Sequence, residues 1–210
     1  MTPDIDAGTL GLQVASSGNP GGYTVKAVAL AGGRQVAEAE SAAGKDIRLK
    51  LSDVQLWSPK HPFLYDLVVT LYKNGKKADE VKSYFGMRKI ALGQDAQGIT
   101  RLFLNNKPLF QYGPLDQGSW PDGLYTAPTD AALKSDMEKT KSWGFNMIRK
   151  HVKVEPQRWY YWCDKLGMLV WQDMPYPANL SDEAKAEFTK ESEENIKQLY
   201  NQPSIICWVL

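Results

Sequence analysis

The sequence has few of the residues that usually carry metal or disulfide chemistry, with two cysteines and two histidines among 210 residues. Cys163 and Cys207 fall inside a predicted helix and a predicted strand, so we expect two buried thiols rather than a disulfide. No group of His, Cys and acidic residues has metal-ligand spacing, and no glycine-rich segment matches a phosphate or dinucleotide fingerprint. The sequence therefore predicts no metal and no cofactor.

Charge of one sign and long apolar runs are also missing. Lys and Arg total 25 against 24 Asp and Glu, a net charge of +1 without a basic stripe, which argues against nucleic acid as a partner. No apolar run approaches the ~20 residues of a membrane span, and residues 1–11 lack the basic and apolar segments of a signal peptide. We therefore expect no membrane partner and assign no compartment.

The first part of the sequence shows apolar residues that recur with a period of two. Short segments of alternating apolar residues recur up to about Ile90, without a helical pattern among them, and glycine-rich turn signals separate them at residues 18–22, 32–33 and 74–75. Five to seven short strands of this kind predict that residues 1–92 form an all-β domain, a small antiparallel sandwich. No titratable cluster lies in it. The alternating segments are Leu10 to Val14, Tyr23 to Ala29, Ile47 to Leu51, Leu67 to Leu71 and Val81 to Phe85.

From Gly93 the pattern becomes mixed, with a hairpin around residues 105–108 and then strands that alternate with helices. Such alternation predicts a parallel sheet, here of about four strands and three helices. Residues 93–210 are about half of the ~250 that a complete eight-unit β/α barrel needs. The expected strands are Leu109 to Gly113, Asn146 to His151, Met168 to Asp173 and Ser204 to Leu210, and the expected helices begin at Thr129, Pro156 and Ser181.

Six segments carry motifs in one order along residues 56–210. They read LWSPKHPFLY (56–65), GMRKI (86–90), LNNKPL (104–109), WGFNMIR (143–149), CDKLGMLVW (163–171) and QPSIICW (202–208). Each is similar to a segment of glycoside hydrolase family 2. In the second segment, GMRKI, Met87 stands where the family's motif between the two domains has Phe. The sequence thus resembles that family over its immunoglobulin-like domain and the first half of its barrel.

The resemblance implies a retaining, exo-acting β-glycosidase that hydrolyses O-glycosidic bonds in carbohydrates, with a carbohydrate as its partner. In the family the acid/base Glu follows the QPSIICW-like strand and the nucleophile comes from a later strand, so we expect the catalytic pair to lie beyond the C-terminus and this chain alone to be inactive. Galactose, glucuronic acid and mannose are all served by the family, and the sugar stays open. The alternatives are a non-catalytic carbohydrate-binding or interaction module and an adhesion unit with an α/β appendage.

Several polar residues are candidates for binding the substrate. Arg149 and His151 lie two apart on one predicted strand, near its carboxyl end, where a barrel builds its pocket. Asp173 ends the next strand, at a position where the family carries an acidic residue. Their alternative role is structural, as strand-end hydrogen-bonding groups, and Lys150, on the opposite face, is expected to be structural.

The loop expected after the first barrel strand adds Asp116 and Trp120 to the predicted substrate-binding residues. A loop dense in Asp, Trp and Gly suits a sugar, because aromatic planes cover apolar ring faces and carboxylates accept bonds from hydroxyl groups. Gln117 and Asp122 lie in the same loop. We expect Asp116 to join Arg149 in one cleft, the alternative being a loop folded on its own hydrogen bonds. Because an incomplete barrel has exposed edge strands, we also expect the chain either to self-associate through residues 204–210 or to be stable only beside the rest of its enzyme.

Overall fold

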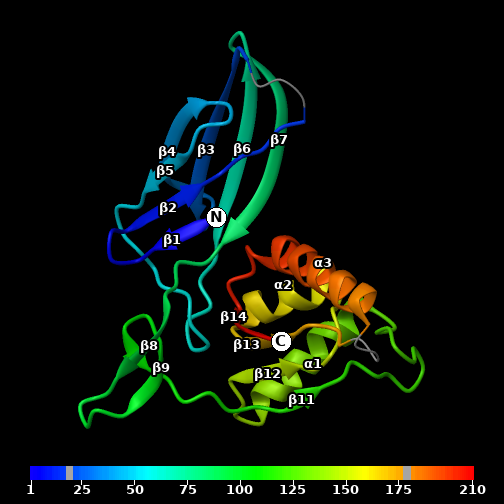
Figure 1. The fold of residues 1–210 in the computed structure, drawn as a ribbon. Coiled ribbons are helices and arrows are strands. Elements are labelled where there is room, and N and C mark those ends of the chain that lie inside the picture. Colours follow the sequence, from blue (N-terminus) through cyan, green and yellow to red (C-terminus); the bar gives the residue numbers. More distant parts are fainter. Residues whose placement is uncertain (18–20, 177–180) are drawn as a thin grey trace. The chain divides into compact units, whose positions relative to one another are not determined.

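The computed structural model describes residues 1–17, 21–176 and 181–210, so part of the turn expected at residues 18–22 lies outside the described residues. The chain divides into two compact units (Figure 1). Unit 1 comprises Met1–Ser58 and Phe63–Pro108, and unit 2 comprises Pro59–Pro62 and Leu109–Leu210. Among the described residues, no helix is both long and apolar enough to cross a membrane.

Unit 1 is built from β-sheets, as the period of two predicts. Two antiparallel sheets, ordered β1-β2-β5 and β4-β3-β6-β7, contribute to one apolar core, in which Leu10 and Leu49 of the first sheet are buried with Val25 and Leu67 of the second. This pairing of two sheets over a common core is the arrangement of a sandwich. The strands are β1 (Thr2–Asp4), β2 (Thr9–Leu12), β3 (Tyr23–Ala31), β4 (Arg34–Ala42), β5 (Ile47–Lys50), β6 (Tyr65–Lys73) and β7 (Lys76–Phe85).

A third sheet in unit 1 departs from the expected division of the chain at residues 92 and 93. Its strands β8 (Ile90–Gln94), β9 (Thr100–Leu104) and β10 (Lys107–Pro108) group with unit 1. The physical reason is Asn105, whose side chain donates to the Trp57 carbonyl at 3.0 Å and accepts from the Lys89 amide at 2.9 Å. Residues 93–108, which we assigned to the second domain, are therefore attached to the first unit by this turn.

Unit 2 contains the predicted parallel sheet, in the order β11-β12-β13-β14. One face of the sheet carries Ile148, Val170 and Ile205, which pack with buried residues of all three helices in one apolar cluster. In the part of the chain that the structure describes, the helix residues of that cluster pack against this face of the sheet and not against the other. This difference between the two faces decides where the candidate site residues lie. The elements are β11 (Leu115–Asp116), α1 (Asp130–Ser142), β12 (Met147–Lys150), α2 (Gln157–Leu166), β13 (Leu169–Asp173), α3 (Asp182–Leu199) and β14 (Ile205–Val209).

The first strand of unit 2 is not where the sequence pattern predicts it. We expected it at Leu109 to Gly113, and the structure has the two-residue strand β11 at Leu115–Asp116 instead. Pro114 has no amide hydrogen for a ladder, and Gly113 passes so close to β12 that a Cβ there would lie 1.5 Å from the Met147 carbonyl oxygen. Regular pairing therefore starts only after these two residues.

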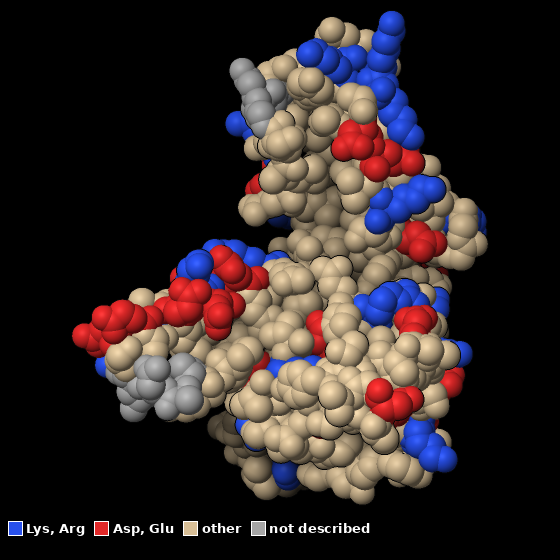
Figure 2. All heavy atoms as spheres, turned by 90° about the vertical axis from the view of Figure 1, so that its right-hand side faces the viewer, with Lys and Arg blue, Asp and Glu red and all other residues tan. Residues whose placement is uncertain are grey.

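The helix boundaries follow the expected capping residues. The side chain of Thr129 accepts from the Ala132 amide at the start of α1, and that of Ser181 accepts from the Ala184 amide at the start of α3. Gly167 ends α2 in the left-handed region at φ 74°. On α3, Lys185, Lys190 and Lys197 form exposed ion pairs with acidic residues three or four positions away, and Figure 2 shows charged side chains of both signs on the face that it presents.

An exposed ion pair connects the start of α1 to α2 and makes a testable contribution to stability. Both carboxylate oxygens of Asp130 accept from Arg158, from Nε and Nη2, at 2.8 Å, and Oδ1 also accepts from Trp162 Nε1 at 3.0 Å. The Arg158 guanidinium, followed by the Trp162 bond, lowers the pKa of Asp130 to about 2. Because the folded-state pKa lies below the ordinary value of about 4, this contribution is present above that value and is lost as the pH falls toward 2.

We therefore expect Asp130→Asn to lower the free energy of unfolding at neutral pH. As the pH falls from about 4 to about 2, the Asp130→Asn variant should lose less stability than the unsubstituted chain. Urea unfolding at several pH values measures both effects. Asp182→Asn is the control, because Asp182 is also a first-turn acid, 96% exposed, and bonds only weakly to Lys185 at 3.2 Å. Equal pH dependence in the two variants would contradict the prediction.

Candidate functional site

The candidate residues divide between the two faces of the parallel sheet. Arg149 is in register with Trp171, and Lys150 with Gln172, so a strand period of two puts Arg149, Trp171 and Asp173 on one face and Lys150 and Gln172 on the other. Asp116 is in register with Lys150 and shares its face. Asp116 thus lies on the helix-covered face. The prediction that Arg149, Asp173 and Asp116 share a single cleft is wrong.

Arg149 and Asp173 form a forked ion pair at the carboxyl ends of adjacent strands, as predicted. Nε of Arg149 donates to Oδ1 of Asp173 at 2.9 Å, and Nη2 donates to Oδ2 at 3.0 Å. The Asp173 side chain is 4% exposed, whereas that of Arg149 is 40% exposed, so the guanidinium is accessible to a ligand. Bonding to Asp173 raises the pKa of Arg149, which stays charged.

His151 extends this ion pair toward the loop after β11. Its Nε2 lies 4.0 Å from Oδ2 of Asp173, and its Nδ1 lies 3.0 Å from Nε2 of Gln117. Because an amide nitrogen donates, Nδ1 is the acceptor of this bond. Gln117, His151, Asp173 and Arg149 therefore form one chain of polar groups, here called the strand-end cluster.

The strand-end cluster has an aromatic and a thiol neighbour. Trp171, two residues before Asp173, donates from Nε1 to Gln111 Oε1 at 2.6 Å and is in register with Cys207 of β14. Cys207 is half-buried rather than buried as expected, and Cys163 is buried; neither forms a disulfide. Partial burial, followed by the charge of Asp173, raises the pKa of Cys207, and Arg149 acts in the opposite direction.

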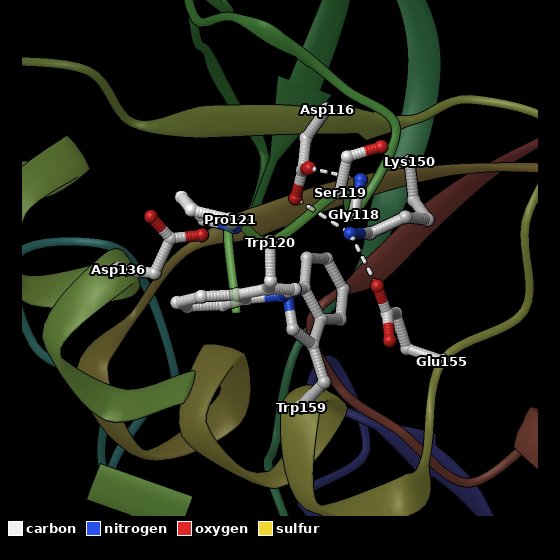
Figure 3. A pocket seen from close by; sticks show the side chains of 9 residues that line it. All are labelled: Asp116, Gly118, Ser119, Trp120, Pro121, Asp136, Lys150, Glu155 and Trp159. Carbon is white, nitrogen blue, oxygen red and sulfur yellow. Dashed lines mark hydrogen bonds and ion pairs between the residues drawn. The ribbon is translucent and has the colours of Figure 1, made fainter. Parts of the chain in front are cut away.

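Asp116 and Trp120 line a separate pocket of about 300 Å³ on the helix-covered face (Figure 3). Asp116 ends β11, where Oδ1 accepts from the Gly118 amide at 2.7 Å and Oδ2 accepts from Lys150 Nζ at 2.5 Å. The indole of Trp159 closes one side, with Lys150 Nζ 4.4 Å from its centroid. Both oxygens of Asp116 are thus engaged inside the protein, which matches the structural alternative for this residue.

Asp136 and Asp122 complete the acidic residues near this loop. Asp136 lies on α1 at the rim of the pocket, where partial burial and the charge of Asp116 raise its pKa. Asp122 is exposed in the short turn between Trp120 and Leu124, which form an isolated bridge. Neither residue reaches the strand-end cluster through a contact in the described structure.

The strand-end cluster and its aromatic neighbour contain two residues, Gln117 and Trp171, that we did not select from the sequence. Gln117 was recognised in the loop but not chosen, and Trp171 was not considered for binding. A period of two places Trp171 on the face of Asp173, so the strand pattern already contained that signal. Gln117 could not be assigned to this face without the register of β11, because a shift of one residue exchanges the two faces.

Comparison with known proteins adds the family. The sequence profile of glycosyl hydrolases family 2 matches residues 1–88. The chain is 32% identical over 163 residues to a putative beta-glucuronidase from Formosa agariphila, covering 76% of this chain and 19% of that protein. It is 26% identical over 162 residues to a beta-galactosidase from Thermoanaerobacterium thermosulfurigenes, covering 75% of this chain and 21% of that protein.

The fold is also similar to a solved structure. The crystal structure of an FMN-binding beta-glucuronidase from Facaelibacterium prausnitzii L2-6 covers 98% of this chain with a TM-score of 0.85 and 26% identity, over 32% of that protein. This chain therefore spans about a fifth of the length of the two relatives and about a third of that structure. The profile match, the two relatives and the shared fold agree with the motif resemblance, and the chain belongs to glycoside hydrolase family 2.

Proposed function

We propose that this chain supplies part of the substrate-binding site of a retaining, exo-acting β-glycosidase. In this proposal unit 1 contains its immunoglobulin-like domain and unit 2 contributes the first half of its β/α barrel. The forked pair of Arg149 and Asp173 is the observation that carries the proposal, because barrels place their substrate groups at the carboxyl ends of parallel strands. The substrate is a β-glycoside of one of the classes that the relatives' names indicate, a galactoside or a glucuronide.

The role of the strand-end cluster in this proposal is recognition and not bond cleavage. A retaining mechanism needs two carboxyl groups ~5 Å apart on either side of the scissile bond. Among the strand residues on this face, within the described part of the chain, Asp173 is the one carboxylate, and Arg149 holds both of its oxygens. The exposed guanidinium of Arg149 and the amide of Gln117 suit hydroxyl groups, and Trp171 supplies an aromatic surface beside them.

A non-catalytic carbohydrate-binding module is the second candidate, favoured by this same shortage of carboxylates. Both candidates predict binding, and they differ in whether a longer form of the protein has turnover.

Self-association through β14, an edge strand of its sheet, stays a prediction.

The experiment combines an activity assay with a binding titration on the purified chain. We expect no hydrolysis of nitrophenyl β-galactoside, β-glucuronide or β-mannoside above a buffer blank. We expect saturable, millimolar-range binding of at least one of the free sugars in a ¹⁵N NMR titration, lost in Arg149→Met. Lys190→Met on α3 is the matched control, because Lys190 is exposed and its ion pair with Glu187 is on the surface of the helix.

Two results would contradict the proposal. Turnover that Asp173→Ala abolishes would assign catalysis to this chain. Absence of binding for all three sugars, or equal binding by Arg149→Met, would remove the strand-end cluster as a recognition site.

A further inference from the structure

Four charged residues are packed together on the helix-covered face, directly behind the strand-end cluster. Lys150, which is fully buried, donates from Nζ to Asp116 at 2.5 Å and to Glu155 Oε1 at 2.8 Å. Lys153 Nζ lies 3.0 Å from the same oxygen of Glu155. These residues, Asp116, Lys150, Lys153 and Glu155, are here called the buried ion network (three of them appear in Figure 3).

The buried ion network fastens the loops that follow β11 and β12. Lys153 Nζ donates to the carbonyl oxygens of Gly118 at 2.9 Å and Tyr125 at 2.7 Å, which belong to the loop after β11. Gly118 is required at this point, because at φ 68° a Cβ would lie 2.3 Å from Glu155 Oε1. The loop after β11 is therefore held against the loop after β12 by charged side chains and a close backbone approach.

A chain of hydrogen bonds continues from the buried ion network to β13. The Glu155 amide donates to the hydroxyl of Tyr160 at 3.2 Å, and that hydroxyl donates to Gln172 Oε1 at 2.6 Å. Nε2 of Gln172 lies within hydrogen-bond distance of the carbonyl oxygens of Lys153, at 2.8 Å, and Asp173, at 2.7 Å. Burial raises the pKa of Tyr160, so its hydroxyl remains a donor.

Residues of the strand-end cluster alternate along the chain with residues of the helix-covered face at three separate places. Asp116 precedes Gln117, Lys150 stands between Arg149 and His151, and Gln172 precedes Asp173. Each residue of the strand-end cluster is thus joined by a peptide bond to a residue held on the helix-covered face. Burying Lys150, Lys153 and Glu155, with Asp116 partly buried beside them, costs desolvation free energy that an apolar core would not incur.

We propose that Lys150 and Glu155 are positioning residues for the strand-end cluster, setting the location of Gln117 and His151 relative to Arg149 and Asp173. The inference rests on the proposed function in that the cluster is taken to bind a sugar. Its geometric part, the control of the Gln117 to His151 contact, stands on the contacts described above. Recognition groups displaced by about 1 Å lose much of their binding, so removal of the network should weaken sugar binding without touching a sugar-facing side chain.

The test uses the whole chain and four variants. Lys150→Met keeps most of the length of the side chain and removes its charge. The double variant Asp116→Asn with Lys150→Met removes an opposite-charge pair, so it should recover stability that the single variant loses. Lys190→Met is the control on α3, and Glu155→Gln, a milder change, serves if Lys150→Met does not fold. The measurements are thermal unfolding, sugar affinity, and the pH titration of the His151 ring nitrogens by NMR.

We expect sugar binding weaker by on the order of tenfold or more in Lys150→Met and in the double variant, with shifted His151 signals in both, even where the double variant unfolds near the normal temperature. Unchanged affinity and His151 signals in a folded variant would overturn the inference and leave the proposed function intact. If the unsubstituted chain binds no sugar, the proposed function fails, and the His151 titration alone decides whether the network positions the ring.

Discussion

Replacing Gly113 by alanine is expected to prevent unit 2 from folding normally. A Cβ at this position would lie 1.5 Å from the Met147 carbonyl oxygen and 2.5 Å from its carbonyl carbon, both of them backbone atoms that cannot rotate away. The segment before β11 would have to move off β12, breaking the bond from the Asn146 amide to Tyr112 and the bond from the Arg149 amide to Pro114. We expect a loss of at least about 3 kcal/mol in the free energy of unfolding.

Urea unfolding followed by circular dichroism measures this loss. Gly11→Ala is the control, because Gly11 lies in β2 of unit 1 and its added Cβ would meet neighbours only at 3.5 Å and beyond, an ordinary contact. We expect this control to change stability by less than about 1 kcal/mol. A Gly113→Ala chain as stable as the control would mean that the segment before β11 does not run this close to β12.

Replacing Asp173 by asparagine is expected to weaken sugar binding by the strand-end cluster strongly and to change the reactivity of Cys207. The amide cannot accept both bonds of the Arg149 fork, so the guanidinium loses its fixed orientation. The charge of Asp173 also raises the pKa of Cys207, while Arg149 lowers it. Removing the carboxylate therefore lowers the pKa of Cys207 and increases its thiolate fraction.

Alkylation by iodoacetamide at about pH 8 reports this change, since the thiolate is the reacting species. We expect faster alkylation of Cys207 in Asp173→Asn than in the unsubstituted chain, with Cys163 protected by burial in both. Sugar affinity should fall by on the order of a hundredfold, because the buried carboxylate that orients Arg149 is lost. Asp182→Asn, on exposed α3, is the control for a change in net charge. An unchanged alkylation rate together with unchanged affinity would refute the role assigned to Asp173.

The sequence by itself determined the order of the elements and the pairing at the strand ends. Capping residues such as Thr129 and Ser181 located the helix starts, because their side chains satisfy amides that a helix leaves unpaired. The juxtaposition of Arg149 and Asp173 followed from parallel strands whose carboxyl ends share one edge and from the period of two. The family motifs led to the same order of elements.

The tertiary structure alone decided which side of the sheet the remaining polar residues occupy. Gly113 and Pro114 delay the first strand of unit 2, so Asp116 faces the helices and Gln117 reaches His151. A one-residue difference in where a strand begins exchanges its two faces, and local sequence carries no information on that register. The attachment of residues 93–108 to unit 1 likewise depends on Asn105 bonding to segments far away in sequence, a long-range contact that periodicity does not encode.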